Sequence, residues 1–335
     1  MMAKRILVTN YRKVELMDFD LPADHLGPSE VVVRTRVSLL SGGTEGSWFQ
    51  GLPLPGREPT PYPRPTGYAS VGDVIAAGEQ SGLQVGDVAY STSPHASAVR
   101  LDTSKQLCLK IPDGLQYEEA VFARLVTVPL ATLRTSRARI GDRAAVVGLG
   151  LVGNLGAQLL QNAGLDATGV DLIPERRELA QSCGITRTLD PREPGAVQPV
   201  HRLVLEASGT AKGAVTAIAL AQLGGEVSLV GTPWVADPSV PSKDILEPVH
   251  VRYITLRSGW EWQFPLFDVA DQPGAVHQPG SVAHNTRAAF ALLRQGKVKV
   301  HELITHRFAP SECQAAYEGA VDRKSQQLGV LFIWE

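Results

Sequence analysis

The pattern of hydrophobic and polar positions divides the 335-residue chain into a strand-rich first part and a mixed second part. In the first part, β-branched runs alternate with polar residues or are closed by glycine, as in residues 30–38, 71–78 and 85–90. This alternation predicts half-buried strands. Short strands at this density are typical of a small barrel or sandwich.

From about residue 117 the apolar positions follow helical spacing, and beyond residue 143 short apolar runs alternate with helical segments. The strand candidates are residues 144–148, 167–171, 202–206, 226–231 and 253–257. Strands that alternate with helices predict a doubly wound parallel sheet, so the fold class is α/β. The last part returns to a mixed pattern, which ends in a predicted strand at 329–333.

The strongest motif is Gly148-Leu149-Gly150-Leu151-Val152-Gly153, which follows a predicted buried strand and opens a helix. In this context Gly148 makes the tight turn, Gly150 lets the backbone approach a pyrophosphate, and Gly153 lets the helix pack on the strand. The first helical residues, Leu151 and Val152, belong to a helix N-terminus that offers N–H groups to phosphates. The motif therefore predicts a dinucleotide site.

The next predicted strand ends in Asp171, twenty-one residues after Gly150. A carboxylate at this place accepts hydrogen bonds from the adenosine ribose hydroxyls and repels a 2′-phosphate. NAD is therefore the expected cofactor. Arg176 and Arg177 leave NADP open, because a guanidinium there can pair with a 2′-phosphate.

Composition narrows the class of protein. A net charge of −2 favours neither nucleic acid nor an anionic membrane as partner. No apolar run approaches the roughly 18–20 residues that cross a bilayer, and the first residues lack the apolar core of a signal peptide. Three separated cysteines form neither a disulfide framework nor a metal cluster. We expect a cytoplasmic enzyme with a small-molecule substrate.

The glycine motif, the preceding Gly141-Asp142 and the later Leu205-Glu206-Ala207-Ser208-Gly209 resemble the medium-chain dehydrogenase/reductase superfamily. The resemblance implies a GroES-like β-barrel catalytic domain, residues 1–122 and 275–335, and a Rossmann domain, residues 123–274. It also implies a homodimer. It places Ser208, Gly231 and Thr232 on the nicotinamide side of the parallel sheet.

The catalytic half departs from the superfamily's zinc pattern. Where zinc-dependent members carry a Cys-Gly-Thr-Asp-like segment, this chain has Gly42-Gly43-Thr44-Glu45. Tyr68 stands at the histidine ligand's position, and Arg124 stands at that of the third ligand. Glycine, tyrosine and arginine cannot supply the ligands that zinc needs. The segments are similar to the zinc-free branch that contains bacteriochlorophyllide dehydrogenases, and no metal site is expected.

Three residues are therefore predicted to replace the metal. Tyr68 moves the hydroxyl proton and Thr44 relays it, while Arg124 lowers the pKa of Tyr68 and either polarises a carbonyl or holds an anionic group of the substrate. In the alternative interpretation, Tyr68 is a packed aromatic and Arg124 pairs with Glu45. Candidates for the substrate pocket are Glu45, Trp48, Phe49, His95 and Trp260. His95 can equally be structural, and Trp260 can lie at a dimer interface.

The sequence leaves three functions open. The first is a zinc-independent, NAD-dependent oxidoreductase that interconverts a secondary alcohol and a ketone, the substrate being a sugar, a cyclitol or a specialised metabolite. The second is an NADPH-dependent enoyl or quinone reductase, which Asp171 disfavours. The third is a non-catalytic NAD-binding protein, which the retention of Thr44 disfavours.

Overall fold

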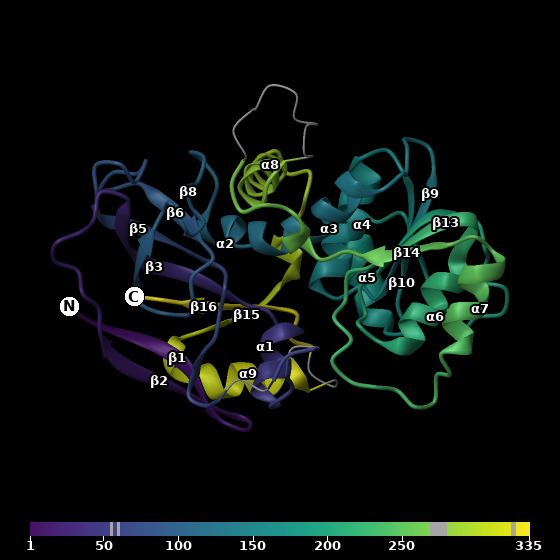
Figure 1. Cartoon of the computed structure of the whole chain (residues 1–335), viewed down its shortest axis with the longest axis horizontal. Helices are drawn as coiled ribbons and strands as arrows, with labels where there is room; N and C mark the ends of the chain where they lie inside the picture. The colour runs from purple at the N-terminus through teal and green to yellow at the C-terminus, as the bar shows by residue number, and fades with distance from the viewer. Residues whose placement is uncertain (54–55, 59–60, 269–279, 323–325) are drawn as a thin grey trace. The chain divides into compact units, whose positions relative to one another are not determined.

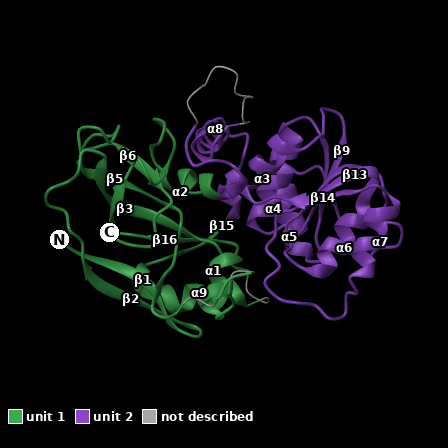
Figure 2. Cartoon of the chain, in the orientation of Figure 1, with its two compact units in different colours: residues 1–124, 304–335 green, residues 125–303 purple. Residues whose placement is uncertain are grey.

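Residues 1–124 and 304–335 form one unit of the fold, and residues 125–303 form the other (Figure 2). The computed structural model describes residues 1–53, 56–58, 61–268, 280–322 and 326–335. The two units, called unit 1 and unit 2 below, are the expected mixture of a strand-rich and an α/β part. No helix of the described chain is long and apolar enough to span a bilayer.

Unit 1 is built mainly from antiparallel strands (Figure 1). Its larger sheet has the order β15-β16-β3-β5-β6-β8, with β7 paired to β3, and its smaller sheet has the order β2-β1-β4. The strands are β1 (Met2–Asn10), β2 (Lys13–Asp20), β3 (Glu30–Leu40), β4 (Arg64–Pro65), β5 (Ser70–Ala77), β6 (Val88–Ser91), β7 (Ala98–Asp102), β8 (Cys108–Lys110), β15 (Ile304–Phe308) and β16 (Gly329–Ile333).

Strand β3 is buried on both faces, which explains its nearly continuous apolar sequence. Val31 and Val33 pack in one apolar cluster with Val74 and Val99, whereas Val32 packs in another. The helices of unit 1 are α1 (Thr44–Phe49), α2 (Tyr117–Ala120) and α9 (Cys313–Val321), and a 3-10 turn, η3, spans Pro310–Glu312.

Unit 2 contains a six-stranded parallel sheet in the order β11-β10-β9-β12-β13-β14. The strands are β9 (Arg143–Val147), β10 (Asp166–Val170), β11 (Arg187–Leu189), β12 (His201–Glu206), β13 (Ala221–Leu229) and β14 (Thr255–Ser258). This order is that of a Rossmann sheet, with the ligand-binding crossover at β9. The five predicted strands are present within a few residues, while the short β11 was not predicted.

Helices cover both faces of this sheet (Figure 1). The helices of unit 2 are α3 (Ala123–Thr135, from Leu125 on), α4 (Leu151–Asn162), α5 (Pro174–Ser182), α6 (Ala211–Leu220), α7 (Lys243–Val251) and α8 (Val282–Arg294), with 3-10 turns η1 (Glu261–Gln263) and η2 (His301–Leu303). Alternate residues of β9 serve the two faces: Val146 packs with Leu160 of α4, and Val147 packs with Ile218 of α6. The doubly wound arrangement confirms the predicted fold class, a GroES-like unit with a Rossmann unit.

The division of the chain differs from the predicted one at its second boundary. Helix α8 and the segment up to Leu303 belong to unit 2, whereas the sequence grouped residues 275–335 with the catalytic domain. The reason is a set of hydrogen bonds to α4. Gln158 Nε2 donates to the Lys299 carbonyl, and the Lys299 N–H donates back to Gln158 Oε1 at 2.7 Å. These bonds hold the chain after α8 against the Rossmann helix.

Candidate active site

The glycine-rich turn between β9 and α4 has the geometry that its spacing predicts. Gly148 has φ of +91°, and a Cβ atom there would lie 2.8 Å from the Ser208 backbone nitrogen. A Cβ atom on Gly153 would lie 1.7 Å from the Gly148 carbonyl oxygen. By contrast, a Cβ atom on Gly150 would meet no described atom within 4 Å. The turn is thus closed on the protein side and open beside the α4 N-terminus, as a pyrophosphate cradle requires.

The loops after β12 and β13 come together at the carboxyl edge of the sheet, where Ser208, Gly231 and Thr232 were predicted. A Cβ atom on Gly231 would lie 2.2 Å from the Gly209 nitrogen, so the two loops pack backbone to backbone. The buried Glu206 carboxylate accepts hydrogen bonds from the N–H groups of Ser208 and Gly209. Burial raises the pKa of Glu206. These contacts fix the loop conformation beside the glycine-rich turn.

Asp171 follows β10 directly and is 7% exposed. Its Oδ2 accepts a hydrogen bond from the Leu149 N–H at 2.7 Å, and its Oδ1 accepts one from the Ile173 N–H at 2.8 Å. Each carboxylate oxygen retains a second lone pair. The Asp171 carboxylate is therefore fixed next to the glycine-rich turn and can still accept hydrogen bonds from hydroxyl groups.

The two arginines that left NADP open differ in their contacts. Arg177 Nη1 donates to the Asp171 carbonyl oxygen at 2.6 Å and lies 3.4 Å from Asp190 Oδ2. Arg176 Nη1 lies 3.9 Å from Asp171 Oδ2, and its side chain is 41% exposed. Arg177 is thus engaged within the protein, while Arg176 remains the guanidinium that can reach a bound nucleotide.

In unit 1, the three predicted catalytic residues lie close together although they come from distant parts of the sequence. Thr44 opens α1, Tyr68 lies in the loop before β5, and Arg124 is the second residue of α3. The Arg124 guanidinium carbon lies 5.0 Å from the centre of the Tyr68 ring. Ser41 and Thr44 lie near enough to Tyr68 to lower the pKa of its hydroxyl. The structure therefore brings the three predicted catalytic residues together.

The electrostatics of Tyr68 differ from the prediction. Burial raises the pKa of the Tyr68 hydroxyl, whereas we expected Arg124 to lower it. Arg124 does act in the expected direction, as do Ser41 and Thr44, but the loss of hydration outweighs them and Glu45 adds to the rise. Tyr68 is therefore a protonated phenol at neutral pH. It is a hydrogen-bond donor and an acid rather than a ready base.

Glu45 is the centre of a buried polar network. Its Oε1 accepts from the Ser41 N–H, and its Oε2 lies 2.6 Å from the hydroxyl groups of Thr66 and Tyr317 and 3.0 Å from His95 Nε2. Glu45 and His95 are both fully buried. Although both were predicted to line the substrate pocket, they lie beneath the surface of unit 1.

The other pocket candidates divide between surface and core. Phe49 is fully buried, with its ring centre 5.6 Å from that of Tyr317, so it is a core residue rather than a pocket wall. Trp48 is partly exposed, and its ring meets that of Tyr68 edge-on at 6.3 Å. Trp260 is 50% exposed and belongs to unit 2. Trp48 is therefore the pocket candidate that lies against the predicted catalytic residues.

The residues that the sequence pattern places at the zinc-ligand positions do not fit zinc. The positions hold Gly42, Tyr68 and Arg124, and a guanidinium repels a cation. Across the described residues, no three His, Cys, Asp or Glu side chains converge as a metal-binding group. The cysteines Cys108, Cys183 and Cys313 are all buried and free.

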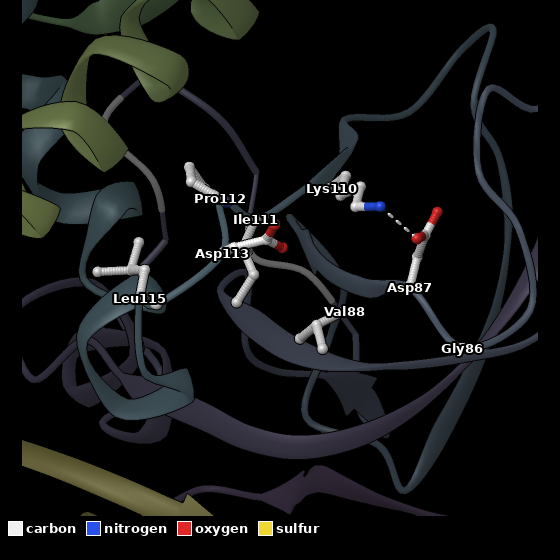
Figure 3. A pocket seen from close by; sticks show the side chains of 9 residues that line it. Gly86, Asp87, Val88, Lys110, Ile111, Pro112, Asp113 and Leu115 are labelled. Atoms are coloured by element: carbon white, nitrogen blue, oxygen red, sulfur yellow. Dashed lines mark ion pairs between the residues drawn. The ribbon is translucent and has the colours of Figure 1, made fainter.

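A pocket of about 260 Å³ also lies beside β6 and β8 (Figure 3). It is lined by residues 86–88 and 110–115, and an ion pair of 2.6 Å joins Asp87 to Lys110 across it. None of the predicted site residues lines this pocket. Sequence reasoning also missed Thr66, Tyr317 and Arg64, which surround the Glu45 network and Trp48. No motif or periodicity marks these three residues.

Comparison with known proteins identifies relatives of the chain. Residues 152–266 match the family model of zinc-binding dehydrogenases. D-guloside 3-dehydrogenase of Escherichia coli K12 is 26% identical over 257 residues, which cover 68% of this chain and 73% of the relative. A 2-desacetyl-2-hydroxyethyl bacteriochlorophyllide A dehydrogenase of Cereibacter sphaeroides is 26% identical over 313 residues, which cover 88% of this chain and 87% of the relative.

Solved structures extend the likeness over the whole chain. A zinc-binding dehydrogenase of Sinorhizobium meliloti 1021 bound to NADP matches with a TM-score of 0.78 at 18% identity, covering 99% of both chains. A short chain alcohol dehydrogenase of Escherichia coli CFT073 complexed with NADH matches with a TM-score of 0.77 at 17% identity, again over 99% of both chains. With its glycine-rich Rossmann turn, its two-unit fold and these relatives, the chain is similar to the medium-chain dehydrogenase/reductase superfamily.

Proposed function

We propose that the protein is a zinc-independent, NAD-dependent oxidoreductase that interconverts a secondary alcohol and a ketone by hydride transfer. The observation that carries the proposal is the juxtaposition of Thr44, Tyr68 and Arg124, which the sequence pattern predicts to replace the metal of zinc-dependent members. The relatives' names describe dehydrogenases of a guloside and of a hydroxyethyl-bearing pigment. These names favour an alcohol substrate, such as a sugar, a cyclitol or a specialised metabolite.

The residues of unit 2 fit a nicotinamide dinucleotide. The open side of Gly150 and the N–H groups of Leu151 and Val152 would hold the pyrophosphate. The Asp171 carboxylate would hold the adenosine ribose, and the loops of Ser208 and Thr232 would flank the nicotinamide. When bound, the cofactor supplies the acceptor or donor of the hydride.

The contacts of Asp171 support NAD over NADP. A 2′-phosphate would come close to a carboxylate that two backbone N–H groups hold in place. Arg177, one of the two cations that could offset this repulsion, is engaged with the Asp171 carbonyl and Asp190. Arg176 alone would have to neutralise the phosphate while it lies near the Asp171 carboxylate.

The chemistry of unit 1 suits ketone reduction at neutral pH. Because burial raises its pKa, Tyr68 keeps its proton and can donate it to the developing alkoxide. The Arg124 guanidinium, which lies over the Tyr68 ring, can stabilise the negative charge on the substrate oxygen. In alcohol oxidation the proton leaves through Tyr68 and the hydroxyl groups of Ser41 and Thr44, and the high pKa makes this direction require alkaline pH.

The test combines metal analysis of the purified protein, calorimetric titration with NAD(H) and NADP(H), and assays on secondary alcohols and ketones. The proposal expects no stoichiometric zinc, tighter binding of NAD(H), and turnover that chelators do not affect. Stoichiometric zinc that activity requires would disprove zinc independence. Tighter NADP(H) binding with turnover of enones would instead identify an enoyl or quinone reductase, and binding without any turnover would identify a non-catalytic protein.

A further inference from the structure

Arg64 is a buried cation beside the predicted catalytic residues. It lies on β4, where its backbone is opposite Val8 of β1, and the residue is 8% exposed. Its guanidinium carbon lies 4.6 Å from the centre of the Trp48 ring. Burial lowers the pKa of Arg64, which reflects the loss of hydration around its charge. An aromatic face attracts a cation but does not neutralise it.

Within the described residues, the Arg64 side chain has neither a hydrogen-bond acceptor nor an ion-pair partner. Glu45, the carboxylate of the neighbouring network, is already occupied by Ser41, Thr66, Tyr317 and His95. None of the Arg64 nitrogens is among the buried polar atoms that lack both a partner and solvent contact. Since they have no partner, these nitrogens retain contact with solvent. The guanidinium is therefore both desolvated and open to a ligand.

Trp48 connects this cation to the predicted catalytic tyrosine. Trp48 makes two contacts: the Arg64 guanidinium lies over its ring, and its ring meets that of Tyr68 edge-on at 6.3 Å. Arg124 then lies over the Tyr68 ring. Two guanidinium groups, those of Arg64 and Arg124, thus flank the pair of rings formed by Trp48 and Tyr68. A guanidinium presents its donors as a planar fork that matches the two oxygens of a carboxylate or phosphate.

We propose that Arg64 and Trp48 form a subsite for an oxyanion group of the substrate, so that the substrate is a hydroxy compound that carries a carboxylate or a phosphate. The Arg64 fork binds the oxyanion, and the Trp48 ring holds the guanidinium in place while it contacts Tyr68. This subsite determines which alcohols bind and takes no part in proton or hydride transfer. The class of substrate rests on the proposed function, whereas the binding of an anion at Arg64 does not depend on it.

The first experiment measures anion binding directly. Inorganic phosphate and acetate are titrated into the full-length protein, with NAD at saturation to fill the α4 N-terminus and again without NAD. The variants are Arg64→Gln, Arg64→Lys and the matched control Arg5→Gln, which removes an arginine stacked on Phe19 at 4.8 Å in the same unit. Comparing phosphate with acetate distinguishes the two oxyanion sources.

The expected result is binding of one anion by the wild type, weakened at least tenfold in Arg64→Gln, weakened less in Arg64→Lys and unchanged in Arg5→Gln. If Arg64→Gln does not fold, Arg64→Lys carries the test, because it keeps the charge but loses the planar fork. Wild-type protein that binds neither anion would overturn the inference. Equal affinity in the folded Arg64 variant would overturn it as well.

The second experiment compares matched substrates: glycerol, glycerate and glycerol 3-phosphate with NAD. An anionic member should show a kcat/KM at least tenfold above that of glycerol, and Arg64→Gln should remove this advantage through KM with little change in kcat. Neutral alcohols turned over equally well by wild type and Arg64→Gln would overturn the subsite and leave the proposed function standing. Arg64-dependent anion binding with no turnover of any alcohol would support the subsite and sink the proposed function.

Discussion

The Nε2 atom of His95 lies 3.0 Å from Oε2 of Glu45, and neither side chain is exposed to solvent. The other ring nitrogen of His95 lies 2.8 Å from the Ser38 hydroxyl, which also accepts a hydrogen bond from Trp334 Nε1. With Tyr317 on the same carboxylate oxygen, this pair links α1 to β3, α9 and the end of β16. The network therefore holds Thr44, the first residue of α1, in place.

We expect Glu45→Gln to lower the free energy of unfolding by about 2–4 kcal/mol, because it removes the buried charge and replaces one of the two acceptor oxygens, which four donors share, by an NH2 donor. Burial alone would raise the pKa of Glu45, but His95 and the hydrogen bonds of Ser41 and Thr66 lower it. A carboxyl whose folded pKa is depressed stabilises the protein above its unfolded pKa and loses this effect as the pH falls through the folded pKa.

Denaturant unfolding between pH 3 and pH 7 measures both effects. The wild type should lose stability below about pH 4.5, the ordinary pKa of a glutamate, and Glu45→Gln should lack this part of the slope. The control is Glu79→Gln, since Glu79 is exposed. A slope and stability in Glu45→Gln equal to those of the wild type would show that the network does not stabilise unit 1.

Two alanine variants of the glycine motif should separate cofactor binding from folding. Gly153→Ala places a methyl group 1.7 Å from the Gly148 carbonyl oxygen, so we expect a loss of stability of about 1–3 kcal/mol or more. Gly150→Ala meets open space and a backbone conformation of φ −63° that any residue adopts. It should melt like the wild type and bind NAD at least tenfold more weakly. Thermal melting and calorimetry measure the two quantities, and normal NAD binding by Gly150→Ala would contradict the pyrophosphate assignment.

Tyr68→Phe should lower kcat for ketone reduction by about 10²-fold or more with little change in melting temperature. The ring contacts with Trp48 and Arg124 remain in the variant, so only the hydroxyl is removed. Because the pKa of Tyr68 is raised, wild-type reduction should stay constant from neutral pH to about pH 10, the ordinary tyrosine value, and fall only above it. Steady-state pH profiles test this, and unchanged turnover in Tyr68→Phe would rule out its role as the acid.

Asp171→Asn should weaken NAD binding about tenfold and narrow the preference over NADP, because it removes the charge that repels a 2′-phosphate. Asp166→Asn, at the other end of β10, is the control and should bind both cofactors like the wild type. Calorimetric titration of each variant with NAD and NADP gives the ratio of dissociation constants. A ratio that Asp171→Asn leaves unchanged would assign cofactor choice to other residues.

The buried thiols should not react with alkylating agents in the folded protein. Burial raises the pKa of Cys108 to about 12 and that of Cys183 to about 11, and it also raises the pKa of Cys313. At pH 8 almost no thiolate is present to act as a nucleophile. Mass spectrometry after iodoacetamide treatment should find no modified cysteine in native protein and three in denatured protein. Rapid native labelling at any of them would contradict their burial.

Helix α1 shows which parts of the site could be predicted from the sequence. Thr44 and Trp48 lie four residues apart on the side of the helix that is partly exposed, while Glu45 and Phe49, also four apart, are fully buried. Residues four apart share a helix face, so a helix across this segment would have separated pocket from core residues. A comparison with the zinc pattern uses only the position of the segment in the sequence and not the helical spacing. It therefore assigned all four residues to the site.

The nucleotide-binding turn was predictable because its glycines, helix and acidic residue lie within a short stretch of sequence. The buried network was not, because Glu45 meets Tyr317 across 272 positions of the chain. Arg64 was missed for another reason: its contact is with an aromatic face, and the proline-rich sequence around it has no periodicity. Local signals identify the cofactor site, whereas long-range packing determines the substrate side.

The interrupted course of unit 1 has a consequence for the synthesis of the protein. Strand β16, the last of the chain, pairs with β3, and Trp334 closes the bond to Ser38. A ribosome has therefore completed all of unit 2 before the segment that finishes unit 1 emerges. Because domains fold as units during translation, unit 2 can fold before unit 1 is complete. Until β16 is synthesised, β3 has no partner strand along one edge. Premature termination near residue 303 would release a formed nucleotide-binding unit joined to an exposed, aggregation-prone sheet.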